Sequence, residues 1–228
     1  MPRIIVLDVN ETLLDLKGLD PHFERVFGSA GVRRDWFKQV VQSALLTTAL
    51  DAYSDFGAVG AAALEMTAKV HGVRLTDADR NAILGAMRDL PPHPEVSDSL
   101  RRPAGARSAP RCAYQLDAGS CRVSAQARGS GRAFRAHPVG RHGAPAQAGS
   151  EVYQMAAREY GVEPGALRLV AAHSWDIAGA LRAGCAAAFV ARPGMTLDPL
   201  FEPPDIVGPD LAAVAERTLA IEAPQSGR

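Results

Sequence analysis

The most informative part of this chain is IIVLDVNETLLD, residues 4–15. Its first four residues form a short apolar run rich in β-branched side chains, which is typical of a buried strand in a parallel sheet. Asp8 follows directly and leads into a polar turn, so it is predicted at the C-terminal end of that strand, where open α/β sheets build their sites. Asp8 is therefore a candidate nucleophile. The alternative is that it only caps the next turn, where aspartate is also favoured.

A second stretch has the same organisation. Residues 169–172 form another apolar run, which is followed by His173, Asp176 and the start of a predicted helix, and a third buried strand is predicted at residues 186–190. Strand, acidic tip, helix and strand in this order form a βαβ unit, so the sequence predicts an α/β protein with a parallel sheet. The acidic strand ends at Asp8 and Asp176 are then expected to meet at one crevice.

These two stretches also carry a family resemblance. DVNETLLD at residues 8–15 and HSWDIAGALRAG at residues 173–184 resemble the first and fourth motifs of the haloacid dehalogenase superfamily, most closely those of its type II 2-haloacid dehalogenases. The resemblance implies two catalytic residues, the nucleophile Asp8 and Asp176 on the neighbouring strand tip. It also implies a substrate-binding set, in which Tyr153 matches a motif tyrosine: Asn10, Thr12, Tyr153, His173 and Trp175.

The resemblance implies a domain organisation as well. The expected parts are a Rossmann-like, doubly wound parallel sheet core at 1–15 and 91–220, a helical cap domain inserted after the first strand at 16–90, and a tail at 221–228. Apolar side chains between Trp36 and Leu45 recur at helical spacing, which supports a helical insertion. Thr76–Asp79 has the pattern of a helix N-terminal cap, and the prolines that begin at Pro91 stop the last helix.

The implied activity is a covalent hydrolysis. In the type II dehalogenases the aspartate displaces halide from the 2-carbon of a small carboxylic acid, and water then hydrolyses the ester without a metal or other cofactor. The alternative is a Mg²⁺-dependent phosphatase of the same superfamily, in which a second aspartate two residues after the nucleophile is a general acid. That position is Asn10 here, and an amide cannot give and recover a proton as a carboxylic acid does, which weighs against the phosphatase.

Several residues depart from the dehalogenase pattern. Aligning Trp36 with the family's Trp-Arg pair places Phe37 where the arginine that contacts halide and carboxylate is expected, although Arg33, Arg34 or Lys38 could reach the site.

Three departures concern the strand tips themselves. Ala171 replaces a serine of the family pattern and His173 replaces an asparagine, while Asn10 replaces an aromatic residue. His173 is open to two interpretations, a base that orients water or a structural hydrogen bond within the core, and we favour the structural one. Asp176 either positions the hydrolytic water or anchors the hydrogen bonds of the site.

Residues 102–150 do not follow the family pattern. The second and third motifs of the family, a strand ending in Thr or Ser and later a Lys, belong in this segment, but neither motif is present and large apolar residues are few. Read one nucleotide later, degenerate codons for Cys112–Ala118 permit LTNS. Those for Gln147–Ser150 permit Lys, Pro and Ala and, with one restored nucleotide, Pro, which spells KPAP ahead of Glu151, so both missing motifs are recovered. We interpret the segment as a compensated frameshift, either a real mutation or a sequence error.

The missing lysine has a consequence for the chain as written. It should balance the charges of Asp8 and Asp176, and without it we expect at least one of their pKa values to rise, which makes Asp8 a poorer nucleophile. Weak or absent activity is therefore predicted. The non-enzyme alternative is an inactive relative in which residues 101–150 are disordered.

The formal net charge of zero averages two unlike parts. Residues 101–150 hold nine of the 25 Lys and Arg but one of the 25 Asp and Glu, which leaves 16 basic and 24 acidic residues elsewhere. Arginine clusters suit nucleic acid, but this segment has few aromatic side chains for stacking, so no nucleic-acid partner is predicted. No run approaches the ~20 apolar residues of a membrane span, and no signal-peptide pattern is present. We expect a cytoplasmic protein with a small carboxylate substrate, and a homodimer is left open.

Overall fold

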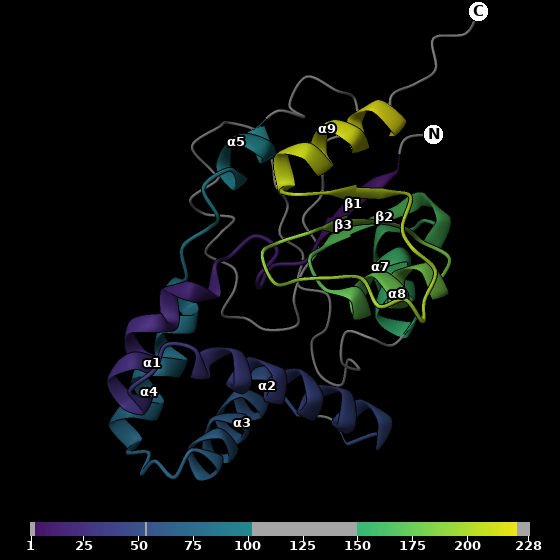
Figure 1. The fold of residues 1–228 in the computed structure, drawn as a ribbon. Coiled ribbons are helices and arrows are strands. Elements are labelled where there is room, and N and C mark those ends of the chain that lie inside the picture. The colour runs from purple at the N-terminus through teal and green to yellow at the C-terminus, as the bar shows by residue number, and fades with distance from the viewer. Residues whose placement is uncertain (1–2, 53, 102–149, 223–228) are drawn as a thin grey trace, which may run out of the picture.

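The computed structural model describes residues 3–52, 54–101 and 150–222 (Figure 1). The strands within these residues form one parallel sheet in the order β1 (Ile4–Leu7), β2 (Leu167–Ala171), β3 (Ala186–Val190) and β4 (Ile206–Gly208). Ile4 of β1 lies opposite Leu167 of β2, and Leu7 lies opposite Val170. The C-terminal ends of β1 and β2 are therefore neighbours, and the predicted α/β class with a parallel sheet is confirmed.

Helices cover both faces of the sheet, as in a doubly wound fold (Figure 1). Those on one face are α7 (Ser150–Tyr160) and α8 (Ser174–Arg182), and those on the other are α5 (Val96–Arg101) and α9 (Leu211–Glu222). Successive strand residues point to opposite faces. Leu169 accordingly joins the apolar cluster under α7 and α8, and its neighbour Val170 joins the cluster under α5 and α9.

The start of β2 differs from the sequence prediction. The strand begins at Leu167, two residues earlier than expected, because Arg168 belongs to it. Arg168 is fully buried, and its guanidinium donates to Asp205 at 2.9 Å and to Glu222 at 3.0 Å. These contacts compensate the charge of a residue type that is almost never buried unless it is paired. The short edge strand β4 has no counterpart in the sequence prediction.

Two helix boundaries also differ. Helix α8 begins at Ser174, three residues before the predicted start at Ile177, so Asp176 lies in its first turn. Helix α9 extends to Glu222, two residues into the predicted tail, where the Glu222 carboxylate accepts from Arg3 as well as from Arg168. All of the segment predicted to be frameshifted except Ser150, the first residue of α7, lies outside the described residues, as does the rest of the predicted tail at 223–228.

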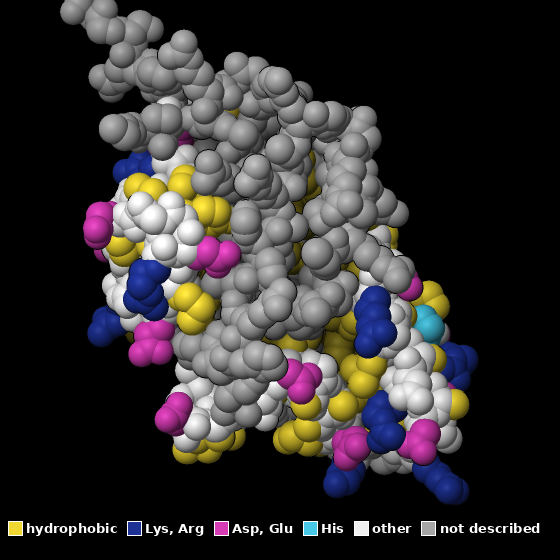
Figure 2. All heavy atoms as spheres, turned by 180° about the vertical axis from the view of Figure 1, so that it is seen from behind, with side chains coloured by type: hydrophobic (Ala, Val, Ile, Leu, Met, Phe, Trp, Pro, Cys, Tyr) yellow, Lys and Arg dark blue, Asp and Glu magenta, His cyan; other side chains and the backbone are white. Residues whose placement is uncertain are grey.

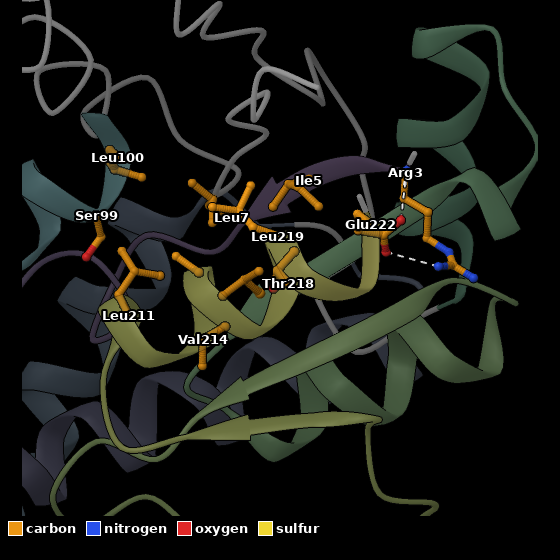
Figure 3. A pocket seen from close by; sticks show the side chains of 12 residues that line it. Arg3, Ile5, Leu7, Ser99, Leu100, Leu211, Val214, Thr218, Leu219 and Glu222 are labelled. Carbon is orange, nitrogen blue, oxygen red and sulfur yellow. Dashed lines mark hydrogen bonds and ion pairs between the residues drawn. The ribbon is translucent and has the colours of Figure 1, made fainter. Parts of the chain in front are cut away.

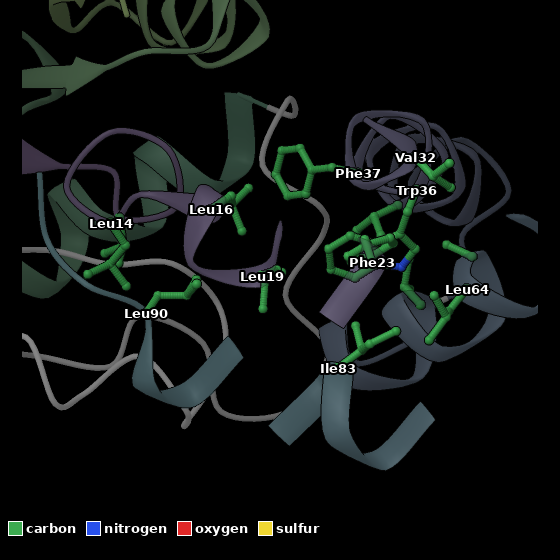
Figure 4. Packing of buried hydrophobic residues seen from close by; sticks show 14 residues of the cluster. Leu14, Leu16, Leu19, Phe23, Val32, Trp36, Phe37, Leu64, Ile83 and Leu90 are labelled. Carbon is green, nitrogen blue, oxygen red and sulfur yellow. The ribbon is translucent and has the colours of Figure 1, made fainter. Parts of the chain in front are cut away.

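The segment after β1 is helical, as predicted. It contains η1 (Leu16–Leu19), α1 (Asp20–Phe27), α2 (Val32–Ala49), α3 (Phe56–Val70), α4 (Asp77–Ala86) and η2 (Met87–Asp89). Phe23, Trp36 and Leu64 form the centre of its apolar core (Figure 4), and the Trp36 indole N–H donates to Gly60 O at 3.0 Å. Thr76 forms the predicted capping box at the start of α4.

The helical segment leaves and rejoins the sheet at one place. A β-bridge joins Leu14, just before the segment, to Pro92, just after it. The chain therefore enters and leaves the helical segment through two neighbouring stretches of backbone. Helix α2 of this segment lies beyond the C-terminal end of β1 (Figure 1). That position agrees with a cap over the strand ends, and the role of residues 16–90 as a separate cap domain stays a prediction.

A small apolar pocket lies between the sheet and α9. Ile5 and Leu7 of β1 and Leu211 and Val214 of α9 line a volume of about 50 Å³, with the Arg3–Glu222 ion pair at one end (Figure 3). A volume of one or two waters is too small for a substrate, so this is a gap in the packing.

The surface of the described residues has mixed charge. On the face seen in Figure 2, basic and acidic side chains lie interspersed with hydrophobic ones over the parts of the chain that are coloured. No helix in the described part of the chain is both long enough and apolar enough to cross a membrane.

Candidate active site

Asp8 lies where the sequence predicted it, immediately after β1. Its backbone N–H donates to Val170 O at 3.0 Å, which continues the pairing of β1 with β2, and its side chain is buried. Thr12 returns to this point through a tight turn, and its hydroxyl donates to Asp8 Oδ2 at 2.5 Å. The same hydroxyl oxygen accepts from the N–H of Ala172 at 2.8 Å. Thr12 therefore links the tips of the two strands and fixes one oxygen of Asp8.

His173 lies between three carboxylates. Its Nδ1 is 3.3 Å from Asp8 Oδ2 and 3.6 Å from Asp176 Oδ2, and its Nε2 is 3.1 Å from Glu11 Oε2. Glu11 is held in a left-handed conformation with φ 58°, which few non-glycine residues adopt, and its carbonyl oxygen lies 3.2 Å from Nε2 of His93. The turn after β1 is thus built to bring both Asp8 and Glu11 to the same imidazole.

These contacts shift the ionisation of the buried groups. Burial alone would lower the pKa of His173, but its contacts with three carboxylates outweigh this effect and hold the pKa well above its usual range. Burial, together with the nearby charge of Asp8, raises the pKa of Asp176, although His173 and Tyr153 oppose the rise. Burial also raises the pKa of Tyr153 well above its usual range, so Tyr153 is a hydrogen-bond donor at neutral pH.

Tyr153 of α7 orients Asp176. Its hydroxyl donates to Asp176 Oδ1 at 2.8 Å. Asp176 Oδ2 and Asp8 Oδ1, by contrast, are buried and have no hydrogen-bond partner among the described residues. His173 Nδ1 is within ion-pair distance of both carboxylates but is not aligned for a hydrogen bond with either. Each aspartate therefore has one fixed oxygen and one unsatisfied oxygen, which is an arrangement suited to a reacting molecule or water.

A cleft of about 530 Å³ lies above these residues, between α2 and the sheet. Phe37 of α2 and Trp175 of α8 line it, and both contact His173, with ring centroids 6.0 Å and 4.2 Å away. Five basic side chains line the cleft, against the carboxylates of Glu11 and Asp15: Lys17, Arg33, Arg34, Lys38 and Arg192. The balance of charge in the cleft favours a small anion.

The predicted binding residues fall into two groups. Trp175 lines the cleft, as do the three basic residues that were predicted to reach the site, Arg33, Arg34 and Lys38. Thr12 and Tyr153 are buried and contact Asp8 and Asp176.

Asn10 is buried and forms a bridge with Leu14 next to the strand end. His173 contacts Asp8 directly rather than lining the cleft. The substrate-binding role of these buried residues stays a prediction, and their observed contacts give Thr12 and Tyr153 the geometry of positioning residues.

Sequence reasoning missed two residues of the site. Glu11 lies within the first motif, but as a polar residue in a turn it gave no signal of its own. Arg192 follows β3, and its guanidinium donates to Thr12 O at 2.7 Å and to Glu95 Oε1 at 2.5 Å. The parallel sheet was a usable signal for Arg192, because residues that follow successive parallel strands gather at one edge.

Asp8, His173 and Asp176 have ligand atoms within 4.8 Å of one another. The set nevertheless fits Mg²⁺ poorly, because Mg²⁺ prefers oxygen ligands and a ring nitrogen faces both carboxylates here. The raised pKa of His173 also favours its protonated form, and a positive charge at this position repels a metal ion.

The parallel sheet, the helical insertion after its first strand and the acidic strand ends place this chain in the fold of the L-2-haloacid dehalogenases. No protein-family model matches the sequence, and no curated protein matches it. Solved structures with this fold do match over nearly the whole chain.

The L-2-haloacid dehalogenase from Xanthobacter autotrophicus, solved with chloropropionic acid covalently bound, is 20% identical, with a TM-score of 0.80 over 98% of this chain and 100% of that one. A second structure of the enzyme is 22% identical, with a TM-score of 0.80 over 97% of this chain and 99% of that one. A defluorinating L-2-haloacid dehalogenase is 17% identical, with a TM-score of 0.76 over 95% of each chain. At these identities the likeness establishes the fold.

Proposed function

We propose that this protein is a hydrolase that displaces halide from the 2-carbon of a small 2-halo carboxylic acid through an ester on Asp8. The observation that carries the proposal is the asymmetry of the Asp8 carboxylate. Oδ2 accepts from Thr12 at 2.5 Å and faces His173 at 3.3 Å, whereas Oδ1 has no hydrogen-bond partner among the described residues. A desolvated oxygen without a donor is the more nucleophilic one, so Oδ1 is the attacking atom.

In the first step Oδ1 of Asp8 forms a bond to the 2-carbon of the substrate, and the carbon–halogen bond breaks with its electron pair on the halide. The substrate carboxylate needs a cation that is not already paired. Arg33 is committed to Asp20, to which it donates at 2.6 Å. Arg34 and Lys38, one turn apart on α2, form no ion pair within the described part of the chain and line the cleft, so they are the proposed carboxylate contacts.

The second step hydrolyses the ester. Water attacks it, Asp8 leaves as a carboxylate, and the products are a 2-hydroxy acid and a proton. Asp176 is placed to orient that water, because Tyr153 holds its Oδ1 while its Oδ2 is left to accept. Since Asp8 Oδ1 is buried beneath the cleft, side chains such as Phe37 and Trp175 must move to admit the substrate.

The test is halide release from 2-chloropropionate. Asp8→Asn should abolish release and should also abolish the covalent mass increase on the chain, while Asp77→Asn, an exposed change at the start of α4, is the matched control. The chain as given is compared with a version whose shifted frame is restored across residues 103–150, and we expect weaker turnover from the former.

Other outcomes would point elsewhere. If neither version releases halide although both are well folded, the dehalogenase proposal is rejected. Release of phosphate from a phosphate ester in the presence of Mg²⁺ would then favour the phosphatase alternative. Activity of the restored version alone would indicate that the chain as given is an inactive relative.

A further inference from the structure

We propose that His173 is the positive charge that holds Asp8, Asp176 and Glu11 together in the site, as a positioning residue rather than as a base. Three carboxylates from three parts of the chain converge on this one ring: Asp8 after β1, Glu11 in the following turn, and Asp176 in the first turn of α8. The side chains of Asp8, His173 and Asp176 are each 3% exposed, so water does little to screen their charges.

Other cations do not take this place within the described residues. The three lysines of the chain, Lys17, Lys38 and Lys69, all lie in described segments, and none forms an ion pair with Asp8 or Asp176. The missing motif lysine led to the expectation that the pKa of Asp8 or Asp176 rises, and burial together with the charge of Asp8 does raise the pKa of Asp176. The group that faces both aspartates in place of a lysine is the imidazole of His173.

The nearby arginines are already engaged. Arg33 lies 3.9 Å from Glu11 and donates to Asp20 at 2.6 Å, and Arg192 donates to Glu95 and to the carbonyl of Thr12. Neither forms an ion pair with Asp8 or Asp176 in the described segments. His173 is thus the cation that contacts both buried aspartates in this part of the chain.

The two ring nitrogens of His173 both need a proton. A neutral imidazole carries one N–H and one lone pair, so either tautomer would turn a lone pair toward a carboxylate. Nδ1 faces Asp8 and Asp176, and Nε2 faces Glu11, so only the imidazolium presents a positively charged N–H on both sides of the ring. An imidazolium has no free lone pair and cannot accept a proton from water, which excludes the general-base interpretation in this state.

The aromatic surroundings also suit a cation. The Trp175 indole stacks on the ring at 4.2 Å with an interplanar angle of 13°, and Phe37 lies 6.0 Å away. The face of an indole attracts a positive charge, and stacking fixes the plane in which both nitrogens reach carboxylates. The pKa of His173, held well above its usual range, agrees with this geometry.

The charged and titratable groups around His173 come from every element packed on it in the described structure. Asp8, Glu11 and Asp176 face the ring directly. Tyr153 of α7 stands behind Asp176, and Arg33 of α2 stands behind Glu11. Removal of any one of the three carboxylates should make the ring easier to deprotonate.

The direct test is ¹⁵N NMR of the histidine rings in the full chain, followed through pH. At about pH 7.5, one unit above the ordinary histidine pKa, both ring nitrogens of His173 should carry a proton. His93 is the internal control, because burial and Arg192 lower its pKa and it should be neutral there. Glu11→Gln or Asp176→Asn should move the His173 titration to lower pH. A singly protonated His173 at that pH would overturn the proposal.

A second test needs no spectrum of the ring. Asp176→Asn should lower the free energy of unfolding of the wild-type chain, because it breaks an ion pair. In a His173→Asn background the same change should raise the free energy of unfolding or leave it unchanged, because it then removes a repulsion from Asp8. Equal losses in the two backgrounds would overturn the charge-balancing role. If His173→Asn does not fold, the NMR titration of the wild-type chain and of Asp176→Asn still decides.

The inference about His173 rests on the proposed function only where turnover is concerned. Neither the NMR titration nor the measurement of the free energy of unfolding uses a substrate. A doubly protonated His173 in a chain that releases no halide would reject the proposed function alone. A neutral His173 in a chain that does release halide would reject this inference alone.

Discussion

The hydroxyl of Tyr153 donates to Oδ1 of Asp176 across 2.8 Å, between helices α7 and α8, in a fully buried setting. The predicted role of Tyr153 in substrate binding stays a prediction, and the observed contact fixes which oxygen of Asp176 faces the strand ends. The second oxygen, Oδ2, is the one that lies 3.6 Å from Nδ1 of His173. The orientation of Asp176, a carboxylate proposed to be catalytic, is thus set by a residue that does not line the cleft.

Tyr153→Phe should lower the free energy of unfolding by about 1–3 kcal/mol, because it leaves a buried carboxylate oxygen without its donor. The pKa of Asp176 should rise further, since one of the contacts that lower it is removed. Urea denaturation measures the first effect. In an Asp176→Asn background the same change should cost less, and an equal cost in both backgrounds would contradict the assigned contact.

Thr12→Val should reduce halide release while keeping the shape of the side chain. The change removes the donor to Asp8 Oδ2 and the acceptor for the N–H of Ala172, so the strand tips lose their link and Asp8 loses its fixed orientation. Thr12→Ser should retain both hydrogen bonds and most activity. Steady-state halide release is the measurement, and Thr67→Val is the matched control, because the buried hydroxyl of Thr67 contacts only a carbonyl of its own helix α3. Equal activity of Thr12→Val and Thr67→Val would contradict the prediction.

How far the site could be predicted from sequence depends on the kind of contact. The positions of Asp8 and Asp176 could be predicted, because an apolar strand followed by a carboxylate places that carboxylate at a known edge of the sheet. The pairing of Tyr153 with Asp176 could not be predicted, because it depends on how α7 and α8 pack. Glu11 was missed, since its backbone adopts a left-handed conformation that the sequence of the turn does not announce.

The same distinction applies to the fold. The capping box at Thr76 and the helical spacing around Trp36 are local signals, and both predictions are confirmed. The start of β2 was predicted two residues late, because a buried arginine looks like a surface residue until its partners Asp205 and Glu222 are brought beside it from much later in the chain. Long-range charge compensation is a property of the folded chain.

Arg168→Met should destabilise the core without touching the site. Methionine fills the buried stem of the side chain, but Glu222 and Asp205 lose their cation. We expect a loss of about 3 kcal/mol, at the lower end of the range for breaking a buried pair, because Arg3 still contacts Glu222 and half of Asp205 is exposed. Thermal or urea denaturation measures it. Arg80→Ala, which removes exposed pairs with Glu65 and Asp77, is the control and should cost at most about 1 kcal/mol.

Arg34→Gln and Lys38→Gln should each raise the KM for 2-chloropropionate more than they lower kcat. Both side chains line the cleft and are free to contact a substrate carboxylate. A hydrogen bond to a charged group contributes about 1.5–3 kcal/mol, so the loss of one predicts about a tenfold or larger change in KM. Lys69→Gln, on α3 outside the cleft, is the matched control. An unchanged KM in both cleft variants would move the carboxylate contact to another of the basic residues that line the cleft.

The stability of the protein should fall as the pH rises above neutrality. The pKa of His173 is higher in the folded chain than in the unfolded chain, where it is about 6.5, so the folded state binds the proton more tightly. The resulting stabilisation is complete below about pH 6.5 and is lost as the pH rises through the folded pKa, by about 1.4 kcal/mol for each unit between the two values. Urea denaturation at a series of pH values should show this decline in the wild-type chain and a flatter profile in His173→Asn. A decline of the same size in both would mean that another group carries the pH dependence.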